Sequence, residues 1–400
     1  MVEMNEKALK LNKHEKILLD LLANGLFDAQ RNADMNSPEM NAVWFEAYFQ
    51  TVTLIAFSGT DRSKGGKNIN QALADNARID YEHARIHEIM TEAGIPYTIL
   101  KGYASALYYR DPLMRSMGDV DFLVDNRYLE AAADAMEKNG YKKTHKNREF
   151  HDVYIGNNCR CELHSEPAGI PKGKTGEKVR EYLADVIEYS KEAQTEVGTV
   201  RVPSDFHHGL IILLHMCHHL TGDGLGMRHL CDWAVFVSSL GEKKFLEMFE
   251  EKLKSIGMWE FAKIMTAIAC DYLGAAEMKW AENADKKLAR RILKDIFSGG
   301  NFGQKSPDRS HESLLISSKN EKDIPMIKQL FRSANSIVYS NWKIAKKYKI
   351  LLPIGWIFFG GRYLIRSVFG KRPAVRVKKI AKEAAERKEL YAKLKMFETE

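Results

Sequence analysis

The run Gly118-Asp119-Val120-Asp121-Phe122-Leu123-Val124 alternates two acidic residues with large apolar ones. Successive side chains of a β-strand point to opposite faces, so Asp119 and Asp121 share one face and the apolar residues face a core. Two neighbouring carboxylates repel each other, and a divalent cation would relieve that repulsion. Mg²⁺ prefers oxygen ligands and is commonly held by one or two carboxylates together with substrate phosphates. The run therefore predicts a buried strand with a metal site at its start.

A second acidic strand is predicted at residues 159–164, in a hairpin with residues 151–155. Alternation puts Arg160, Glu162 and His164 on one face of that strand, with Cys159 and Cys161 on the other. Glu162 is therefore a candidate third carboxylate for the metal site. The two cysteines are expected to be structural, since a C-x-C spacing with no second pair is poor evidence for zinc.

Lys101-Gly102 follows a short apolar strand at residues 95–100 and precedes a predicted helix. Free N–H groups at the start of a helix can bind a phosphate, and glycine lets the backbone approach it closely. Lys101 would add positive charge. Arg115, four residues before Asp119, is a candidate for the same phosphates.

Taken in their order along the chain, the motifs resemble those of the uncharacterised nucleotidyltransferase family, which belongs to the polymerase-β-like superfamily. The resemblance rests on the following runs: Leu100-Lys101-Gly102, Arg115 to Val124, Gly140-Tyr141 and Glu162-Leu163-His164. It is clearest over residues 95–164 and continues more loosely to about residue 370. In that superfamily a glycine-containing turn contacts the nucleotide phosphates, and three acids bind two Mg²⁺ ions.

The resemblance implies that Gly102 forms the turn and that Asp119, Asp121 and Glu162 hold the metal. It also implies transfer of a nucleotidyl group from an NTP to an unknown hydroxyl-bearing acceptor. One departure is that Gly102 is followed by Tyr103 and not by serine or glycine. Lys101 is expected to substitute for the missing hydroxyl, with Ser105 as a weaker candidate.

Two other functions stay open. The protein could modify a protein partner, as toxin–antitoxin nucleotidyltransferases do. It could also be an inactive member of the fold that serves as a binding module. The three acids favour an active enzyme, whereas the missing Gly-Ser turn mildly favours the inactive alternative.

The pattern of elements predicts an α+β fold, with a small α/β nucleotidyltransferase core flanked by helical regions. The expected divisions are a helical N-terminal region (1–94), the catalytic core (95–170), a helical C-terminal domain (171–340) and a basic amphipathic tail (341–400). One helix is expected from Ser37 to Ala56. A break in the helical pattern is expected near residues 197–205, where Gly198 and Pro203 occur.

Six histidines lie between residues 207 and 229. His215 and His219 are four residues apart and would share a helix face. Met216 stands where a zinc protease needs its glutamate, so that class is excluded. The family resemblance also covers His215 and Asp232. These two residues, with His164, are expected to serve either substrate binding or packing.

The formal net charge of +7 is uneven, because residues 341–400 hold 16 basic and 5 acidic residues. The rest of the chain is mildly acidic and gives no strong nucleic-acid signal. Residues 341–380 are expected either to contact an anionic membrane or polyanion, or to dock on the body. The absence of a signal-peptide pattern and the five sparse cysteines predict a cytoplasmic protein, with a peripheral membrane contact as an open alternative.

Overall fold

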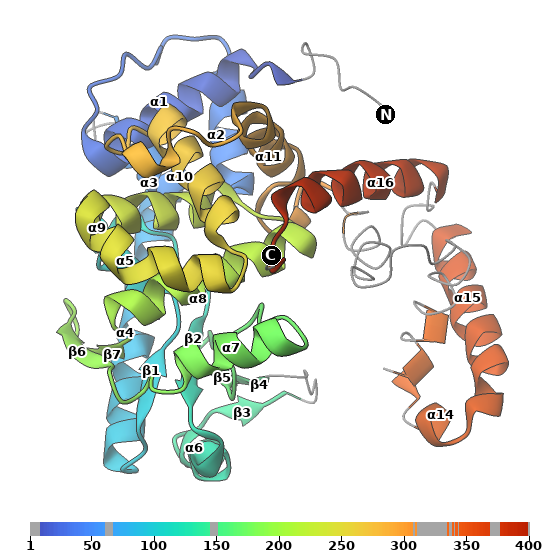
Figure 1. Cartoon of the computed structure of the whole chain (residues 1–400). Helices are drawn as coiled ribbons and strands as arrows, with labels where there is room; N and C mark the ends of the chain where they lie inside the picture. Colours follow the sequence, from blue (N-terminus) through green and yellow to red (C-terminus); the bar gives the residue numbers. More distant parts are fainter. Residues whose placement is uncertain are drawn as a thin grey trace.

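A computed structural model shows an α+β protein in which a mixed β-sheet lies against a larger helical body (Figure 1). The structure describes residues 9–60, 67–144, 151–306, 309, 334–335, 338–339, 341–342, 344–368 and 377–398. The α+β class predicted from the sequence is confirmed, and the five-stranded sheet lies within the segment where strands alternating with short helices were expected.

The sheet has the strand order β1-β2-β5-β4-β3, in which β2 and β5 are parallel and the other neighbours are antiparallel. The strands are β1 (Tyr97–Ile99), β2 (Val120–Val124), β3 (Lys142–Lys143), β4 (His151–Gly156) and β5 (Cys159–His164). The predicted hairpin is present between β4 and β5. Its turn residues Asn157 and Asn158 have φ of 50° and 59°, as a tight hairpin turn requires.

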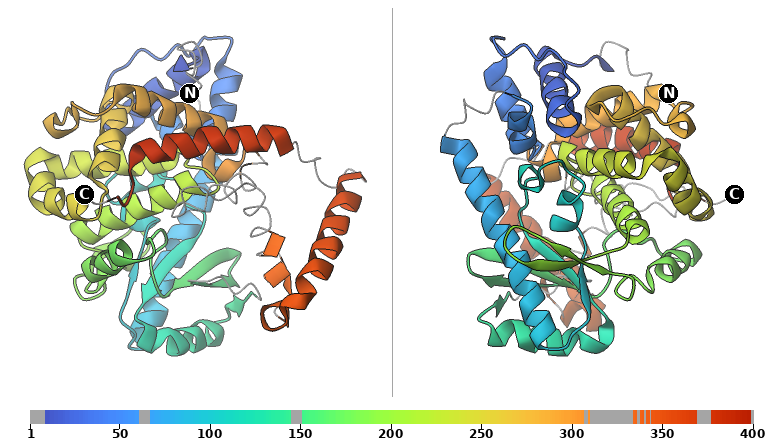
Figure 2. Two further views of the ribbon diagram at one scale, coloured as in Figure 1. Left: turned by 45° about the vertical axis from the view of Figure 1, so that its right-hand side comes forward. Right: turned by 90° about the vertical axis from the view of Figure 1, so that its left-hand side faces the viewer.

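One face of the sheet packs on α4 (Lys67–Glu92) and α6 (Leu129–Lys138), as Figure 2 shows for the long helix α4. Alternate side chains of β2, from Val120 to Val124, share a core with Ile86 and Met90 of α4 and with Met136 of α6. Because these side chains point toward α4 and α6, the acidic side chains of β2 lie on the opposite face, toward the helical body.

The helical body is built from chain segments that precede the sheet strands in the sequence and from segments that follow them. Its helices are α1 (Lys13–Phe27), α2 (Met40–Phe49), α3 (Thr53–Ser58), α7 (Lys174–Leu183), α8 (Asp205–Thr221), α9 (Met227–Ser255), α10 (Trp259–Leu273) and α11 (Lys286–Gly299). Leu18 and Leu22 of α1 belong to the same core as Trp233 of α9 and Ile268 of α10. The N-terminal helices and those after residue 205 thus share one core, while the domain boundaries at residues 94, 170 and 340 stay predictions.

Two sequence expectations about local structure are corrected. The helix expected from Ser37 to Ala56 is two helices, α2 and α3, because Thr51 between them has a left-handed φ of 57°. The expected break near residues 197–205 is part of a two-stranded hairpin, β6 (Lys191–Gln194) and β7 (Thr199–Val202). β6 carries mainly polar side chains and so lacks the apolar alternation by which a strand is recognised.

The C-terminal segment divides into α14 (Ile344–Lys347), α15 (Leu352–Val368) and α16 (Val377–Leu394). Leu390 and Tyr391 of α16 enter the core of the helical body, where Arg387 Nη2 donates to the Leu220 carbonyl at 3.1 Å. α15 lies apart from the sheet and the helical body in Figure 1 and in the left view of Figure 2. Within the described part of the chain, every helix is too short or too polar to cross a bilayer.

Candidate active site

Three carboxylates from two parallel strands converge on the face of the sheet that looks toward the helical body. Asp119 directly precedes β2, Asp121 lies within it, and Glu162 of β5 is the register partner of Asp121. Their oxygens lie within 4.8 Å of one another. Asp121 and Glu162 are buried, whereas Asp119 is half-buried. The structure therefore brings together the three acids that the sequence singled out.

The alternation of β5 explains how Glu162 reaches this face. Cys159, Cys161 and Leu163 are buried in the core under the sheet, as predicted for structural cysteines. The residues between them, Arg160 and Glu162, then point to the side of β2 where Asp121 lies.

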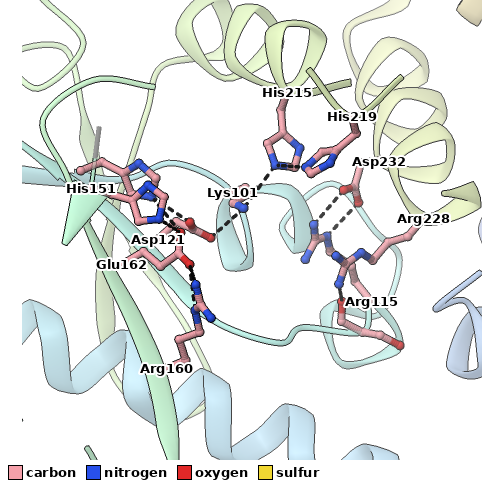
Figure 3. A network of polar contacts seen from close by, with 12 residues as sticks. Lys101, Arg115, Asp121, His151, Arg160, Glu162, His215, His219, Arg228 and Asp232 are labelled. Atoms are coloured by element: carbon pink, nitrogen blue, oxygen red, sulfur yellow. Dashed lines mark hydrogen bonds and ion pairs between the residues drawn. The ribbon is translucent and has the colours of Figure 1, made fainter. Parts of the chain in front are cut away.

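Asp121 is the most enclosed of the three carboxylates and contacts two basic groups (Figure 3). Lys101 Nζ lies 3.0 Å from its Oδ2, and His164 Nε2 lies 2.9 Å from its Oδ1. Burial alone would raise the pKa of Asp121, but Lys101 and His164 outweigh burial and lower it. Burial also opposes the charged forms of the two partners, yet the pKa of Lys101 and that of His164 are both raised by Asp121. Asp121 is thus ionised at neutral pH, the state in which a carboxylate binds metal.

Glu162 and Asp119 have contrasting surroundings. Arg160 Nε donates to Glu162 Oε1 at 2.8 Å, and His151 Nε2 lies 3.3 Å from Oε2. Burial opposes ionisation of Glu162, but hydrogen bonding from His164 and the nearby basic groups lower its pKa. For Asp119, burial and then repulsion by Asp121 raise the pKa. The local cations therefore do not remove the like-charge repulsion at Asp119.

This arrangement fits a divalent metal ion. The three acids supply the oxygen ligands that Mg²⁺ prefers. The raised pKa of Asp119 reflects first its burial and then repulsion by Asp121, and such an ion would relieve that repulsion. The residues that would hold it are Asp119, Asp121 and Glu162.

Gly102 lies at the end of the loop after β1 and begins the single helical turn α5 (Tyr103–Ala106). Its φ is +63°, and a Cβ at this position would lie 2.7 Å from His83 Nε2, so only glycine fits. Ser105 is buried, and its Oγ has no hydrogen-bond partner among the described residues. Tyr103, which stands where a hydroxyl-bearing serine was expected, is also buried. The groups available to a phosphate here are thus the Gly102 backbone and Lys101.

Arg115 forms an ion pair with the helical body. Its Nε and Nη2 donate to the two carboxylate oxygens of Asp232 on α9 at 2.8 and 2.7 Å, and Tyr109 adds a third hydrogen bond at 2.7 Å. Both partners of the ion pair are buried. In this structure its guanidinium group is engaged by Asp232, and the expectation that Arg115 reaches the phosphates stays a prediction. The pair joins the loop before β2 to the helical body.

Three histidines from α8 and α9 form a histidine cluster, defined as His215, His219 and His229. Their ring centroids are 4.3 to 5.2 Å apart. Lys101 Nζ lies 3.2 Å from His215 Nε2, so Lys101 connects the cluster to Asp121 (Figure 3). Burial lowers the pKa of all three imidazoles, that of His229 to about 3.

Besides the three acids, sequence reasoning selected Lys101, Gly102, His164 and His215 and noted the four-residue spacing to His219, but it gave no role to several neighbouring basic residues. Arg160 was placed on the correct face without a role, whereas His151, Arg228 and His229 were not selected. Arg228 Nη1 donates to the Ser116 carbonyl at 3.0 Å, close to the start of β2. No spacing rule links α9 to the strands, so Arg228 and His229 had no local signal, whereas His151 lies opposite His164 in the predicted hairpin.

Comparison with protein families agrees with this geometry. The family model described as an uncharacterised nucleotidyltransferase matches residues 66–274, and no curated protein matches the sequence significantly. The matched region is more than half of the chain and includes the three carboxylates, Lys101, Gly102 and the histidine cluster. The chain therefore belongs to the uncharacterised nucleotidyltransferase family.

Proposed function

We propose that the protein is a Mg²⁺-dependent nucleotidyltransferase that moves a nucleotidyl group from an NTP to a hydroxyl-bearing acceptor. The observation that carries the proposal is the convergence of Asp119, Asp121 and Glu162 on neighbouring parallel strands. Family membership supports the NTP as substrate. A purely structural role for the three acids is disfavoured, because burying like charges together lowers the stability of the fold.

The chain's own residues have distinct roles in this proposal. Asp119, Asp121 and Glu162 would hold up to two Mg²⁺ ions, which activate an acceptor hydroxyl and stabilise the leaving pyrophosphate when bound. Lys101 and His164 keep Asp121 ionised in the metal-free protein. Lys101, which also reaches the histidine cluster, supplies positive charge next to the Gly102 backbone, where the phosphates would lie.

The test is to incubate the full-length protein with each labelled NTP and Mg²⁺ in a cell extract, and to measure pyrophosphate release and label on any acceptor. Asp119→Asn and Asp121→Asn should each lower pyrophosphate release at least about 100-fold, since each removes a charged metal ligand. Asp125→Asn is the matched control, because Asp125 directly follows β2 but bonds to Arg127 at the surface. Normal turnover in Asp121→Asn would refute the assignment.

The two rival functions give different results in the same experiment. Label on a protein, seen as a mass shift of a co-expressed polypeptide, would identify a protein-modifying enzyme. Absence of pyrophosphate release with every NTP, in a protein that still binds NTP, would identify an inactive binding module.

We also propose that α15 contacts an anionic membrane surface. Ile354 and Ile357, three residues apart on α15, are 56% and 78% exposed, and Ile350, just before the helix, is 82% exposed. Docking on the body would have covered these side chains. Residues 341–380 contain 11 Lys and Arg residues and no Asp or Glu, a charge that complements anionic lipid headgroups.

Sedimentation of the full-length protein with phosphatidylserine-containing vesicles tests this contact. Wild type should bind these vesicles and should not bind vesicles of phosphatidylcholine alone. Ile354→Asp combined with Ile357→Asp should abolish binding, whereas Val197→Asp, at an exposed apolar site on the β6–β7 turn, should leave it intact. Equal vesicle binding by wild type and the double variant would remove the membrane proposal.

A further inference from the structure

Lys101 connects the histidine cluster to the carboxylate site, but the cluster is made of imidazole groups and contains no carboxylate. His215 Nε2 and His219 Nε2 lie 3.0 Å apart, and Lys101 Nζ lies 3.2 Å from the same His215 atom. In neutral form an imidazole has one protonated and one unprotonated nitrogen, so the hydrogen bonds of each ring fix where its proton lies. These bonds decide whether the cluster offers lone pairs or donors.

The ammonium group of Lys101 can only donate, so His215 Nε2 accepts and the His215 proton lies on Nδ1. His219 Nε2 faces the same lone pair and therefore carries a proton itself. Two donors thus approach one lone pair, which can satisfy only one of them well. A donor of Lys101 or of His219 is left for another acceptor.

His229 and Arg228 add further donors. The Gly226 N–H donates to His229 Nδ1 at 3.3 Å, which places the His229 proton on Nε2. His229 is 4% exposed, and its Nε2 has no hydrogen-bond partner among the described residues. Arg228 Nε is likewise buried and without a partner in the described part of the chain. A buried donor without an acceptor is costly, so its presence points to a ligand.

The charged groups near the histidine cluster indicate whether that ligand is a cation or an anion. After burial, Lys101, Arg228 and neighbouring histidines all lower the pKa of His215 and His219. Asp232 acts on His229 and Arg228, but it is already paired with Arg115. A metal ion would need lone pairs directed inward and would be repelled by Lys101. An anion rich in acceptor oxygens would instead satisfy the donors of Lys101, His219, His229 and Arg228 together.

We propose that the histidine cluster, with Lys101 and Arg228, binds a phosphoryl group of a substrate of the transfer reaction. This inference rests on the proposed function, because Lys101 contacts both His215 and the metal-site residue Asp121. The phosphoryl group belongs either to the triphosphate of the NTP or to a phosphorylated acceptor.

Calorimetric titration of the full-length, metal-free protein with inorganic tripolyphosphate and with inorganic phosphate tests the site. His219→Gln and His229→Gln should each weaken binding about 10-fold, the equivalent of about 1.4 kcal/mol for one lost bond to a charged group. His218→Gln is the matched control, since His218 is the exposed neighbour of His219 on the same helix, and it should bind as wild type does. Because His229 also caps α9, His219→Gln decides the result if His229→Gln unfolds.

Binding of tripolyphosphate and phosphate that is equal in wild type and His219→Gln would overturn the proposal. Stoichiometric Zn²⁺ binding that is lost in His219→Gln, without phosphate binding, would also overturn it in favour of a metal site.

The source of the phosphoryl group is decided by saturating the protein with α,β-methylene ATP before adding phosphate. Loss of the histidine-dependent phosphate binding assigns the cluster to the NTP triphosphate, and retention assigns it to a phosphorylated acceptor. Normal turnover with normal affinities in His219→Gln would remove this inference alone. Phosphate binding by the cluster without any pyrophosphate release would remove the transfer function alone.

Discussion

Replacing Asp232 with alanine should destabilise the protein strongly, because Asp232 is half of a buried ion pair. Arg115 is 4% exposed and donates to both carboxylate oxygens, and Tyr109 donates to one of them. Asp232→Ala leaves the guanidinium group of Arg115 buried without its counter-charge and leaves the Tyr109 hydroxyl without its acceptor. Breaking a buried pair in this way costs about 3–5 kcal/mol of unfolding free energy.

Urea unfolding followed by circular dichroism measures this loss. Asp271→Ala is the control, since Asp271 pairs with Lys286 at 2.9 Å on the surface and should contribute no more than about 1 kcal/mol. The double variant Arg115→Met with Asp232→Leu should recover most of the stability, because neither charge then remains buried alone. A loss below about 1 kcal/mol in Asp232→Ala would refute the structural role of the pair and would leave Arg115 free for the phosphates.

Three further substitutions test the structure. Gly102→Ala should lower the unfolding free energy by at least about 2 kcal/mol in urea, because it combines a left-handed φ with a Cβ 2.7 Å from His83 Nε2. His208→Phe should remove a pH dependence: burial lowers the pKa of His208 from 6.5 to about 4, so its stabilising effect is complete above pH 6.5 and decreases as pH falls toward 4. Between pH 7 and 5 wild type should lose about 2 kcal/mol more than this variant in urea titrations. Gly209→Ala should destabilise by about 1 kcal/mol in thermal unfolding, since its Cβ would lie 2.5 Å from Phe249.

The acidic part of the site could be predicted because its signals are local. Asp119 and Asp121 share a strand face by alternation alone, and Glu162 follows from the same rule applied to residues 159–164. What the alternation could not show is that β2 and β5 are direct neighbours with Asp121 opposite Glu162. The family resemblance grouped Glu162 with the two aspartates, and the strand pairing itself comes from the structure.

The remainder of the site depends on contacts between segments far apart in the sequence. Arg115 and Asp232 are 117 residues apart, so neither position indicates that the other is its partner. Arg115 therefore suggested a free phosphate ligand, although the structure places it in the ion pair. His229 was missed for the same reason, because it joins His215 and His219 only through the packing of α9 on α8.

The net charge of the body is a poor guide to its ligand, and Lys101 illustrates why. Outside residues 341–400 the chain is mildly acidic. The histidine cluster beside the three carboxylates nevertheless contains no acidic residue, and Lys101 and Arg228 lie near it. Lys101 lies 3.0 Å from Asp121 and 3.2 Å from His215, between the acidic and the basic part of the site. A divalent cation at the acids would repel Lys101, and a phosphoryl group at the histidines would attract it. The binding of one therefore favours the binding of the other, and by thermodynamic reciprocity the effect is equal in both directions.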